Sequence, residues 1–306
     1  MITVRRNRER RHIQGGKCDM WLTFSPPQEG PLRPAGDFGA LVALNEVRLA
    51  PGGAFAPPAR EEAEIVTYVY RGALAQEDST GSSGVVQAGE LQSMITGRGI
   101  RHKETNASRS EWAHIFRISL VPSQVGLGCG SEQKRFAAAQ RRNVLCVVAS
   151  PDGRKGSLRL LQDTIICSSV LDSGYHLVHE LFPGRVAWLH IIRGEVTMHD
   201  VILNPGDGAG TVLEPSVSLT ARENTEILLV DLYRAPRTSP AGGSLAGPTG
   251  EVALPPGSTA CSMATRPRPP TSLPPLLTKP APDGRRPRTA SCPRQAHDNE
   301  APRRRA

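Results

Sequence analysis

Residues 65–72 read IVTYVYRG, and residues 187–194 read AWLHIIRG. Both runs are rich in β-branched and aromatic residues, and both end at an Arg-Gly pair, Arg71-Gly72 in the first and Arg193-Gly194 in the second. A short run of this composition that stops at a glycine is typical of a β-strand followed by a turn. The two runs therefore predict two strands that end in the same way.

Other parts of the chain repeat this strand character. Residues 112–120 (WAHIFRISL) alternate apolar with small or polar residues, as a half-buried strand does, and residues 226–232 (EILLVDL) read as a last strand. Gly, Asn, Asp and Pro interrupt such runs at short intervals, which is the pattern of an all-β sandwich or barrel. The best helix candidate is short and covers residues 132–142, where three alanines stand together.

The Arg-Gly runs belong to a longer repeat. Gly72 precedes Gly89 by 17 residues, Gly194 precedes Gly206 by 12 residues, and each later glycine stands between a small residue and an acidic one. The shared frame is a strand, an Arg-Gly turn, a hairpin and a second turn into another strand. Two copies of this frame predict two similar β-domains, joined near residues 122–143, where Pro and Gly cluster.

The C-terminal part of the chain has a different composition. Of the 37 Lys and Arg, 29 Asp and Glu and 27 Pro in the 306 residues, 11, 4 and 15 respectively lie in residues 236–306, which contain no Phe, Trp or Tyr. Such a stretch cannot bury enough apolar area to offset the entropy lost on ordering it. We therefore predict a disordered tail over residues 236–306, whose arginines are solvated rather than bound to nucleic acid.

Two features of the sequence bear on its compartment. No apolar run approaches the roughly 20 residues that span a bilayer, and no apolar region follows the basic start, so neither a membrane protein nor a secretory signal is expected. None of the six cysteines stands in a Cys-x-x-Cys pair, which indicates reduced thiols rather than disulfides or a zinc site. We predict a cytoplasmic protein.

Several motifs together resemble a known family. The Arg-Gly frame is similar to the cupin pattern, and eight segments, in order and at matching spacing, resemble the pirin family: residues 21–25, 37–46, 49–55, 64–69, 76–79, 96–104, 148–153 and 206–209. The resemblance implies a bicupin, which is two double-stranded β-helix (jelly-roll) barrels. It gives an N-terminal barrel over 1–125, a linker over 126–143, a C-terminal barrel over 144–235 and the tail over 236–306.

The resemblance also implies a metal site, which this sequence keeps only in part. Family members hold iron or another divalent transition metal in the N-terminal barrel with three histidines and one glutamate. His102 and Glu104 match one pair of ligands, but Pro58 and Arg60 stand at the other two positions. Proline has no ligating atom and arginine only donates. We therefore expect no cofactor, with iron as the alternative if Glu61, Glu62 or Glu64 supplied ligands after a register shift.

Without a metal, His102 and Glu104 are open to two interpretations. They are either an inherited polar pair or partners of Arg60, whose guanidinium would pair with Glu104 and lower its pKa. Glu64, Arg98 and Arg101 lie close to these residues in sequence and, with Arg60, complete the predicted pocket. We expect it to take a small aromatic or anionic ligand.

Other titratable residues suggest no chemistry of their own. His176 and His179 are three apart, so on a strand they face opposite sides, and with His190 and His199 they are interpreted as surface or satisfied core histidines. Arg5, Arg6, Arg8, Arg10 and Arg11 lie in an opening segment that resembles an edge strand with its arginines in water.

Two functions follow from the resemblance. The favoured one is a metal-free protein that binds a small ligand or a regulatory protein partner. The alternative is a quercetin 2,3-dioxygenase-like enzyme, whose mechanism requires the metal that the substitutions at Pro58 and Arg60 disfavour.

Overall fold

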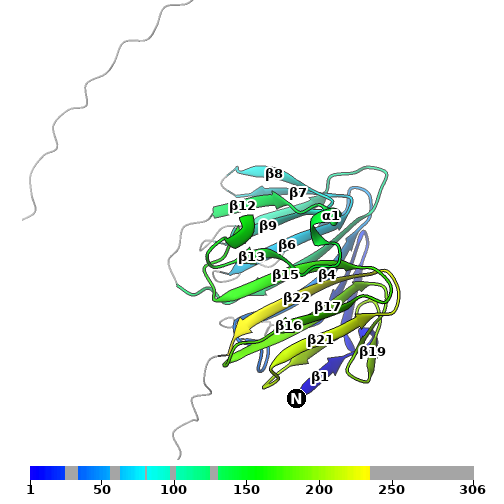
Figure 1. Cartoon of the computed structure of the whole chain (residues 1–306). Coiled ribbons are helices and arrows are strands. Elements are labelled where there is room, and N and C mark those ends of the chain that lie inside the picture. The colour runs from blue at the N-terminus through cyan, green and yellow to red at the C-terminus, as the bar shows by residue number, and fades with distance from the viewer. Residues whose placement is uncertain (25–33, 56–62, 80, 97–100, 125–129, 235–306) are drawn as a thin grey trace, which may run out of the picture. The chain divides into compact units, whose positions relative to one another are not determined.

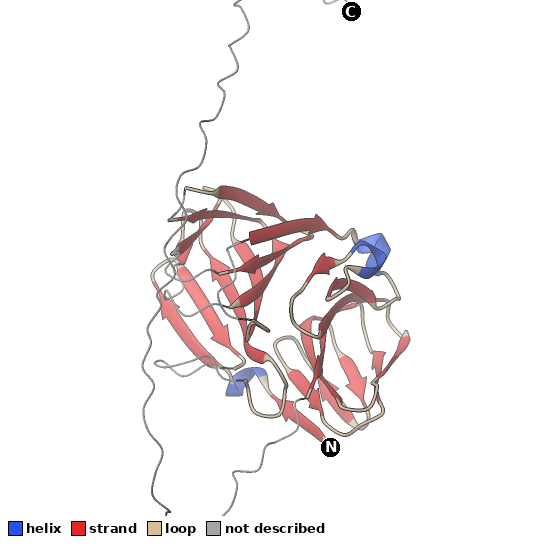
Figure 2. Ribbon diagram, turned by 90° about the vertical axis from the view of Figure 1, so that its left-hand side faces the viewer, coloured by secondary structure: helices blue, strands red, loops and turns tan. Residues whose placement is uncertain are grey.

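The computed structural model describes residues 1–24, 34–55, 63–79, 81–96, 101–124 and 130–234. These residues form four sheets, and the helices are short turns: η1 (Asn7–Glu9), α1 (Ala138–Arg141) and η2 (Arg154–Gly156) (Figure 2). In the described ranges no helix is long and apolar enough to cross a membrane. The predicted all-β fold is confirmed.

The first half of the chain forms a seven-stranded and a four-stranded sheet. The larger sheet has the order β12 (Gly130–Arg135), β9 (Glu90–Ile95), β6 (Glu64–Arg71), β11 (Ala113–Leu120), β4 (Leu41–Leu49), β3 (Cys18–Leu22) and β2 (Arg11–Gly15). The smaller has the order β5 (Ala54–Phe55), β10 (His102–Asn106), β7 (Ala73–Asp78) and β8 (Ser83–Gln87). The two sheets face each other as one barrel.

The second half repeats this arrangement (Figure 1). Its larger sheet has the order β1 (Ile2–Arg5), β20 (Gly208–Thr211), β17 (Arg185–Arg193), β22 (Thr225–Tyr233), β15 (Thr164–Leu171), β13 (Cys146–Ser150) and β14 (Leu158–Arg159). Its smaller sheet has the order β16 (His176–Glu180), β21 (Ser216–Ala221), β18 (Val196–Met198) and β19 (Val201–Leu203). In both larger sheets the Arg-Gly strand, β6 or β17, lies third, so the repeat read in the sequence is a repeat of topology.

Two edge strands pair with strands that are distant in the sequence. Strand β1 pairs with β20 of the second barrel, and β12, which falls in the expected linker, pairs with β9 of the first. Each barrel thus takes one edge strand from beyond its own end, and that strand covers backbone groups that would otherwise be exposed. The helix expected over 132–142 is correspondingly reduced to α1, because residues 130–135 are a strand.

The interiors of the two barrels differ in polarity. Inside the second barrel the described buried residues form a continuous apolar cluster that includes Leu189, Ile191 and Leu229. Inside the first barrel the apolar cluster is smaller, includes Val47, Val69 and Ile115, and leaves room in the described interior for polar side chains. The more polar interior makes the first barrel the better candidate for a ligand site.

A third cluster lies between the barrels and contains side chains from both. The rings of Phe24 and Phe38 pack edge-on against Trp188, with centroids 4.6 and 5.2 Å away. Strands β6 and β11 therefore have two buried faces. Even-numbered residues such as Tyr68 and Phe116 face the other barrel, and odd-numbered residues such as Val69 and Ile115 face their own barrel's interior.

One of the arginines near the N-terminus, Arg10, is buried instead of exposed to solvent. The side chain of Arg10 is 0% exposed, and its Nη1 lies 2.8 Å from Glu46 Oε2. The expectation of a wet arginine face is therefore wrong at Arg10, because η1 turns this residue inward between the barrels, where Glu46 compensates its charge.

Candidate functional site

A row of polar side chains crosses the larger sheet of the first barrel on its interior face. Strand register places Asn45, Arg117, Thr67 and Gln92 side by side on β4, β11, β6 and β9. Asn45, Thr67 and Arg117 each stand two positions from an apolar residue of the barrel interior, so their side chains point inward. Gln92 also points inward, because its neighbour Leu91 packs in the cluster between the barrels. Thr67, Gln92 and Arg117 are buried.

The smaller sheet presents a matching row from the opposite side. Glu104 on β10 stands between Phe55 on β5 and Gln76 on β7, and His102 lies two residues further along β10. Glu104 is 1% exposed. Its Oε1 lies 3.3 Å from Arg117 Nη1, and the Arg117 guanidinium also lies 5.3 Å from the centre of the Phe55 ring. This ion pair joins the two sheets across the barrel.

Several buried polar atoms around this ion pair have no hydrogen-bond partner in the described part of the chain. They are Asn45 Oδ1, Gln76 Nε2, Gln92 Oε1, His102 Nε2 and Glu104 Oε2. An unsatisfied buried polar group destabilises a protein by about 1–3 kcal/mol. Five such atoms in one barrel mark a polar interior whose hydrogen-bonding groups are free to bind a ligand or water.

The protonation of Glu104 follows from its burial. Desolvation raises the pKa of the carboxyl, although the charges of Arg117 and His102 act in the opposite direction. The expectation of a lowered pKa at Glu104 is therefore wrong, because loss of water outweighs one cation at 3.3 Å.

Two other residues of the predicted pocket, Arg101 and Glu64, lie away from this ion pair. Arg101 is exposed, and its backbone N–H donates to Ser79 Oγ at 3.2 Å. Glu64 occupies an even-numbered position on β6 and faces the second barrel, where its carboxylate accepts backbone N–H groups of Leu161 at 2.7 Å and Gln162 at 3.1 Å. Glu64 thus joins the barrels instead of lining the interior.

Some predictions fall on parts of the chain that the structure leaves undescribed. Pro58, Arg60, Glu61 and Glu62 lie in residues 56–62, and Arg98 lies in residues 97–100. The predicted Arg60–Glu104 pair stays a prediction. The structure adds Arg117, which sequence reasoning missed although it stands inside the strand read at 112–120.

The family's metal does not fit the residues of this barrel that the structure describes. Among the described residues no group of three or more His, Cys, Asp and Glu converges on one point. Of the two family-type ligands present, Glu104 is already engaged by the Arg117 cation, and Pro58 and Arg60 offer no ligating lone pair at the other two positions. A divalent ion would be repelled by Arg117 and held by too few donors.

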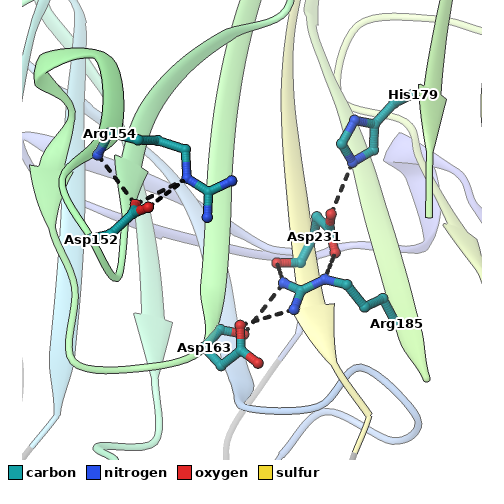
Figure 3. Close-up of polar contacts among 6 residues, drawn as sticks. All are labelled: Asp152, Arg154, Asp163, His179, Arg185 and Asp231. Carbon is teal, nitrogen blue, oxygen red and sulfur yellow. Dashed lines mark hydrogen bonds and ion pairs between the residues drawn. The ribbon is translucent and has the colours of Figure 1, made fainter. Parts of the chain in front are cut away.

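The histidines of the second barrel lie apart from one another. The Nε2 of His179 lies 2.9 Å from Asp231 Oδ2 (Figure 3). Arg185 bridges two carboxylates: its Nε lies 2.5 Å from Asp231 Oδ1, and its Nη1 lies 2.8 Å from Asp163 Oδ1. His176 is exposed and contacts Thr220 Oγ1 through Nδ1 at 2.9 Å. These residues make an ordinary hydrogen-bonded network.

His190 departs from the expectation of a satisfied histidine. It is fully buried on the face between the barrels, and neither ring nitrogen has a partner within the described residues. Burial, reinforced by the positive charge of Arg10, lowers the pKa of His190 to about 3. His190 is therefore a neutral core residue at physiological pH.

Family models match both halves of the chain. The model described as Pirin matches residues 9–119, and the model described as Quercetinase C-terminal cupin domain matches residues 147–232. The chain is 35% identical over 232 residues to the quercetin 2,3-dioxygenase of Escherichia coli (strain K12), which covers 76% of this chain and 99% of that protein. It is 33% identical over 196 residues to a pirin-like protein of Caulobacter vibrioides, with 64% of this chain and 84% of that protein covered.

Solved structures agree with these matches. The crystal structure of YhhW from Escherichia coli superposes with a TM-score of 0.69 at 33% identity, covering 77% of this chain and 99% of that one. The structure of bacterial pirin YhhW in complex with nickel(II) gives a TM-score of 0.68 at 33% identity, covering 77% and 100%. The two-barrel fold is therefore that of known pirins.

Proposed function

This chain belongs to the pirin family, and from that premise we propose that its first barrel binds a small hydroxylated aromatic molecule without a metal ion. The Arg117–Glu104 ion pair carries the proposal. In this barrel the guanidinium supplies the positive charge beside Glu104 that a metal ion would otherwise supply. On this proposal the site keeps a polar interior but lacks the donor set for metal chemistry.

The unpartnered atoms around the ion pair define the ligand class. Asn45 Oδ1, Gln92 Oε1 and Glu104 Oε2 are acceptors, whereas Gln76 Nε2 is a donor. A ligand that satisfies them must present several hydroxyl groups, which both donate and accept. The Phe55 ring beside Arg117 adds an apolar surface for a flat ring. Because Glu104 already compensates Arg117, a neutral ligand fits this interior better than an anion.

Metal content is the first test. Protein purified without chelator should contain far less than stoichiometric iron, nickel, copper or manganese by elemental analysis, because two of four family-type ligands are missing. The variant Pro58→His/Arg60→His should bind nickel(II) more tightly than the wild type, and adding Arg117→Gln should strengthen binding further by removing the opposing cation. Stoichiometric metal in the wild type that is lost in His102→Ala would overturn the metal-free proposal.

Quercetin is the probe for the ligand. We expect metal-free protein to bind it in a fluorescence titration, and Gln76→Leu/Gln92→Leu to weaken binding by about tenfold, because two hydrogen bonds are lost. Gln87→Leu on the exposed face of β8 is the matched control and should leave the affinity unchanged. Equal affinity in the wild type and the double variant would place the ligand elsewhere.

Dioxygenase activity is the second candidate, and the similarity to the Escherichia coli quercetin 2,3-dioxygenase favours it. On our proposal quercetin turnover stays at background even when iron(II) or nickel(II) is added. Turnover that requires added metal and disappears in His102→Ala would establish the enzyme instead.

The cellular setting is also part of the proposal. Cys18, Cys146 and Cys167, the cysteines in the described residues, are free thiols. Burial raises the pKa of all three, and that of Cys167 to about 12. Unreactive reduced thiols support a cytoplasmic ligand-binding or regulatory protein.

A further inference from the structure

A cleft lies between the two barrels, on the other side of strands β6 and β11 from the barrel interior. Its volume is about 500 Å³, and residues of both barrels line it, including Arg48, Tyr70, Arg71, Trp112, His114 and Arg193. Arg48, Tyr70 and His114 are even-numbered residues of β4, β6 and β11, which face away from Arg117 and Thr67. This interbarrel cleft is therefore distinct from the site proposed above.

Corresponding residues from both copies of the sequence repeat line the cleft. In the first barrel the ladder between β6 and β11 skips Tyr70, so that Arg71 stands opposite His114. In the second barrel the ladder between β17 and β22 skips Ile192, so that Arg193 stands opposite Glu226. A bulge of this kind turns consecutive side chains toward the same side. The pairs Tyr70-Arg71 and Ile192-Arg193 therefore both line the cleft.

The arginines of the cleft differ in whether an acidic side chain compensates their charge. Arg48 Nη2 lies 3.0 Å from Glu46 Oε1, so its charge is compensated. The guanidinium of Arg71 lies 5.2 Å from the Tyr70 ring centre, and within the described residues neither Arg71 nor Arg193 makes a side-chain hydrogen bond or ion pair. Among the described lining residues Asp19 is the one that is acidic, and its Oδ1 lies 3.8 Å from His12 Nε2. Two uncompensated cations against one carboxylate favour a monoanion.

An aromatic surface adjoins these cations. Trp112 is 54% exposed, which is a large fraction for an indole, and it lines the cleft together with Tyr70 and the largely buried Ile192. An exposed indole beside arginines offers a stacking face next to a guanidinium that binds carboxylates through two parallel hydrogen bonds.

We propose that the interbarrel cleft binds a small aromatic carboxylate. Arg71 and Arg193, one from each copy of the repeat, hold the carboxylate, and Trp112 and Tyr70 contact the ring. The ligand bridges the barrels because each supplies one of the two cations.

The test compares 2-naphthoate with its neutral analogue 2-naphthamide, using the Trp112 indole N–H signal in two-dimensional NMR, assigned from Trp112→Phe. We expect 2-naphthoate to shift this signal and to bind about tenfold or more tightly than 2-naphthamide, because only the anion forms charge-assisted hydrogen bonds. The affinity should fall with added salt, since the cleft is open to solvent.

Variants separate the cleft from other surfaces. Arg71→Gln/Arg193→Gln should raise the Kd for 2-naphthoate by about tenfold or more, and each single variant should raise it by less. Arg159→Gln on the edge strand β14, which does not line the cleft, is the matched control and should change nothing. Trp112→Ala, followed by calorimetry, should weaken both naphthalene probes. Equal affinity for the two probes, or an unchanged Kd in the double arginine variant, would overturn the proposal.

Discussion

Arg117 and Glu104 show how one buried ion pair stabilises the first barrel. Each side chain is nearly inaccessible, at 6% and 1% exposure, and removing one partner leaves the other charge without compensation. We expect Arg117→Met to lower the free energy of unfolding by about 3–5 kcal/mol at pH 7 in urea titrations. The double variant Arg117→Met/Glu104→Gln should recover most of this loss. A loss below about 1 kcal/mol in the single variant would be that of an exposed pair and would contradict the buried geometry.

Glu46 makes the stability of the protein sensitive to acid. Burial by itself would raise the pKa of Glu46, but the hydrogen bond with His114 at 2.8 Å and the charge of Arg10 outweigh it and hold the pKa well below its usual range. A carboxyl with a lowered folded-state pKa contributes stability above its unfolded pKa of about 4.3, and that contribution is lost as the pH falls through the folded pKa.

The variant Glu46→Gln tests this contribution. It should lower the free energy of unfolding by about 3 kcal/mol at pH 7, because Arg10 loses its buried partner. The difference from the wild type should stay constant above about pH 5 and shrink steadily below it, because Glu46 then takes up a proton in the unfolded wild type but stays ionised in the folded state. Equilibrium unfolding between pH 7 and pH 3 measures both values. A difference that grows in acid would show the opposite shift of the Glu46 pKa.

At the level of single elements, the turns after β6 and β17 fix the geometry of the repeat. Gly72 and Gly194 have φ angles of 75° and 82°, and a Cβ at Gly194 would lie 2.6 Å from the Asn224 carbonyl oxygen and from Thr225 Cα. L-residues other than glycine rarely adopt such a φ, and here the neighbouring backbone also leaves no space. These turns place Arg71 and Arg193 at the cleft.

The variant Gly194→Ala should therefore destabilise the protein by more than the strain of placing an alanine at a positive φ. Gly174 is the matched control, because its φ is also 82° but a Cβ at Gly174 would have no neighbouring atom within 4 Å. We expect Gly174→Ala to lower the free energy of unfolding by about 1–2 kcal/mol, the strain of the left-handed conformation, and Gly194→Ala to exceed that by about 2 kcal/mol or more. Equal losses in thermal or urea unfolding would mean that the backbone around Gly194 relaxes easily.

At the level of the whole molecule, the two barrels are built as one unit. The N-terminal strand β1 joins the sheet of the second barrel, both barrels share the apolar cluster around Trp188, and buried polar contacts cross between them. One such contact is the Tyr68 hydroxyl, which donates to Glu226 Oε1 at 2.6 Å. The described residues from 1 to 234 accordingly belong to one compact unit.

The tail should be dispensable for this unit. Residues 235–306 lie outside the described chain, and the family matches end at residue 232. From the composition of residues 236–306 we expect limited proteolysis to leave a stable fragment ending near Ala235, with the same thermal midpoint as the full chain. A lower midpoint in a chain truncated after Ala235 would show that the tail packs on the barrels.

Local patterns in the sequence were enough to predict the strands, the repeat and part of the site. Strand periodicity and Arg-Gly turns are short-range signals, because two-residue alternation and a positive φ depend on immediate neighbours. They predicted two similar all-β halves, and the order of the motifs predicted the family. His102 and Glu104 could be read together because they are two apart on one strand. The polarity of residues 130–135 was readable as well, but whether they form helix or strand depends on β9 as a partner.

Only the tertiary structure decided which side chains meet. Strands β6 and β11 are buried on both faces, so alternation between polar and apolar residues could not show that Arg117 points into the barrel and Glu64 toward the other barrel. The same holds for Arg71 and Arg193, which are 122 positions apart and meet in one cleft. Such convergence is set by strand register and by the packing of one barrel on the other, and no short segment of sequence contains that information.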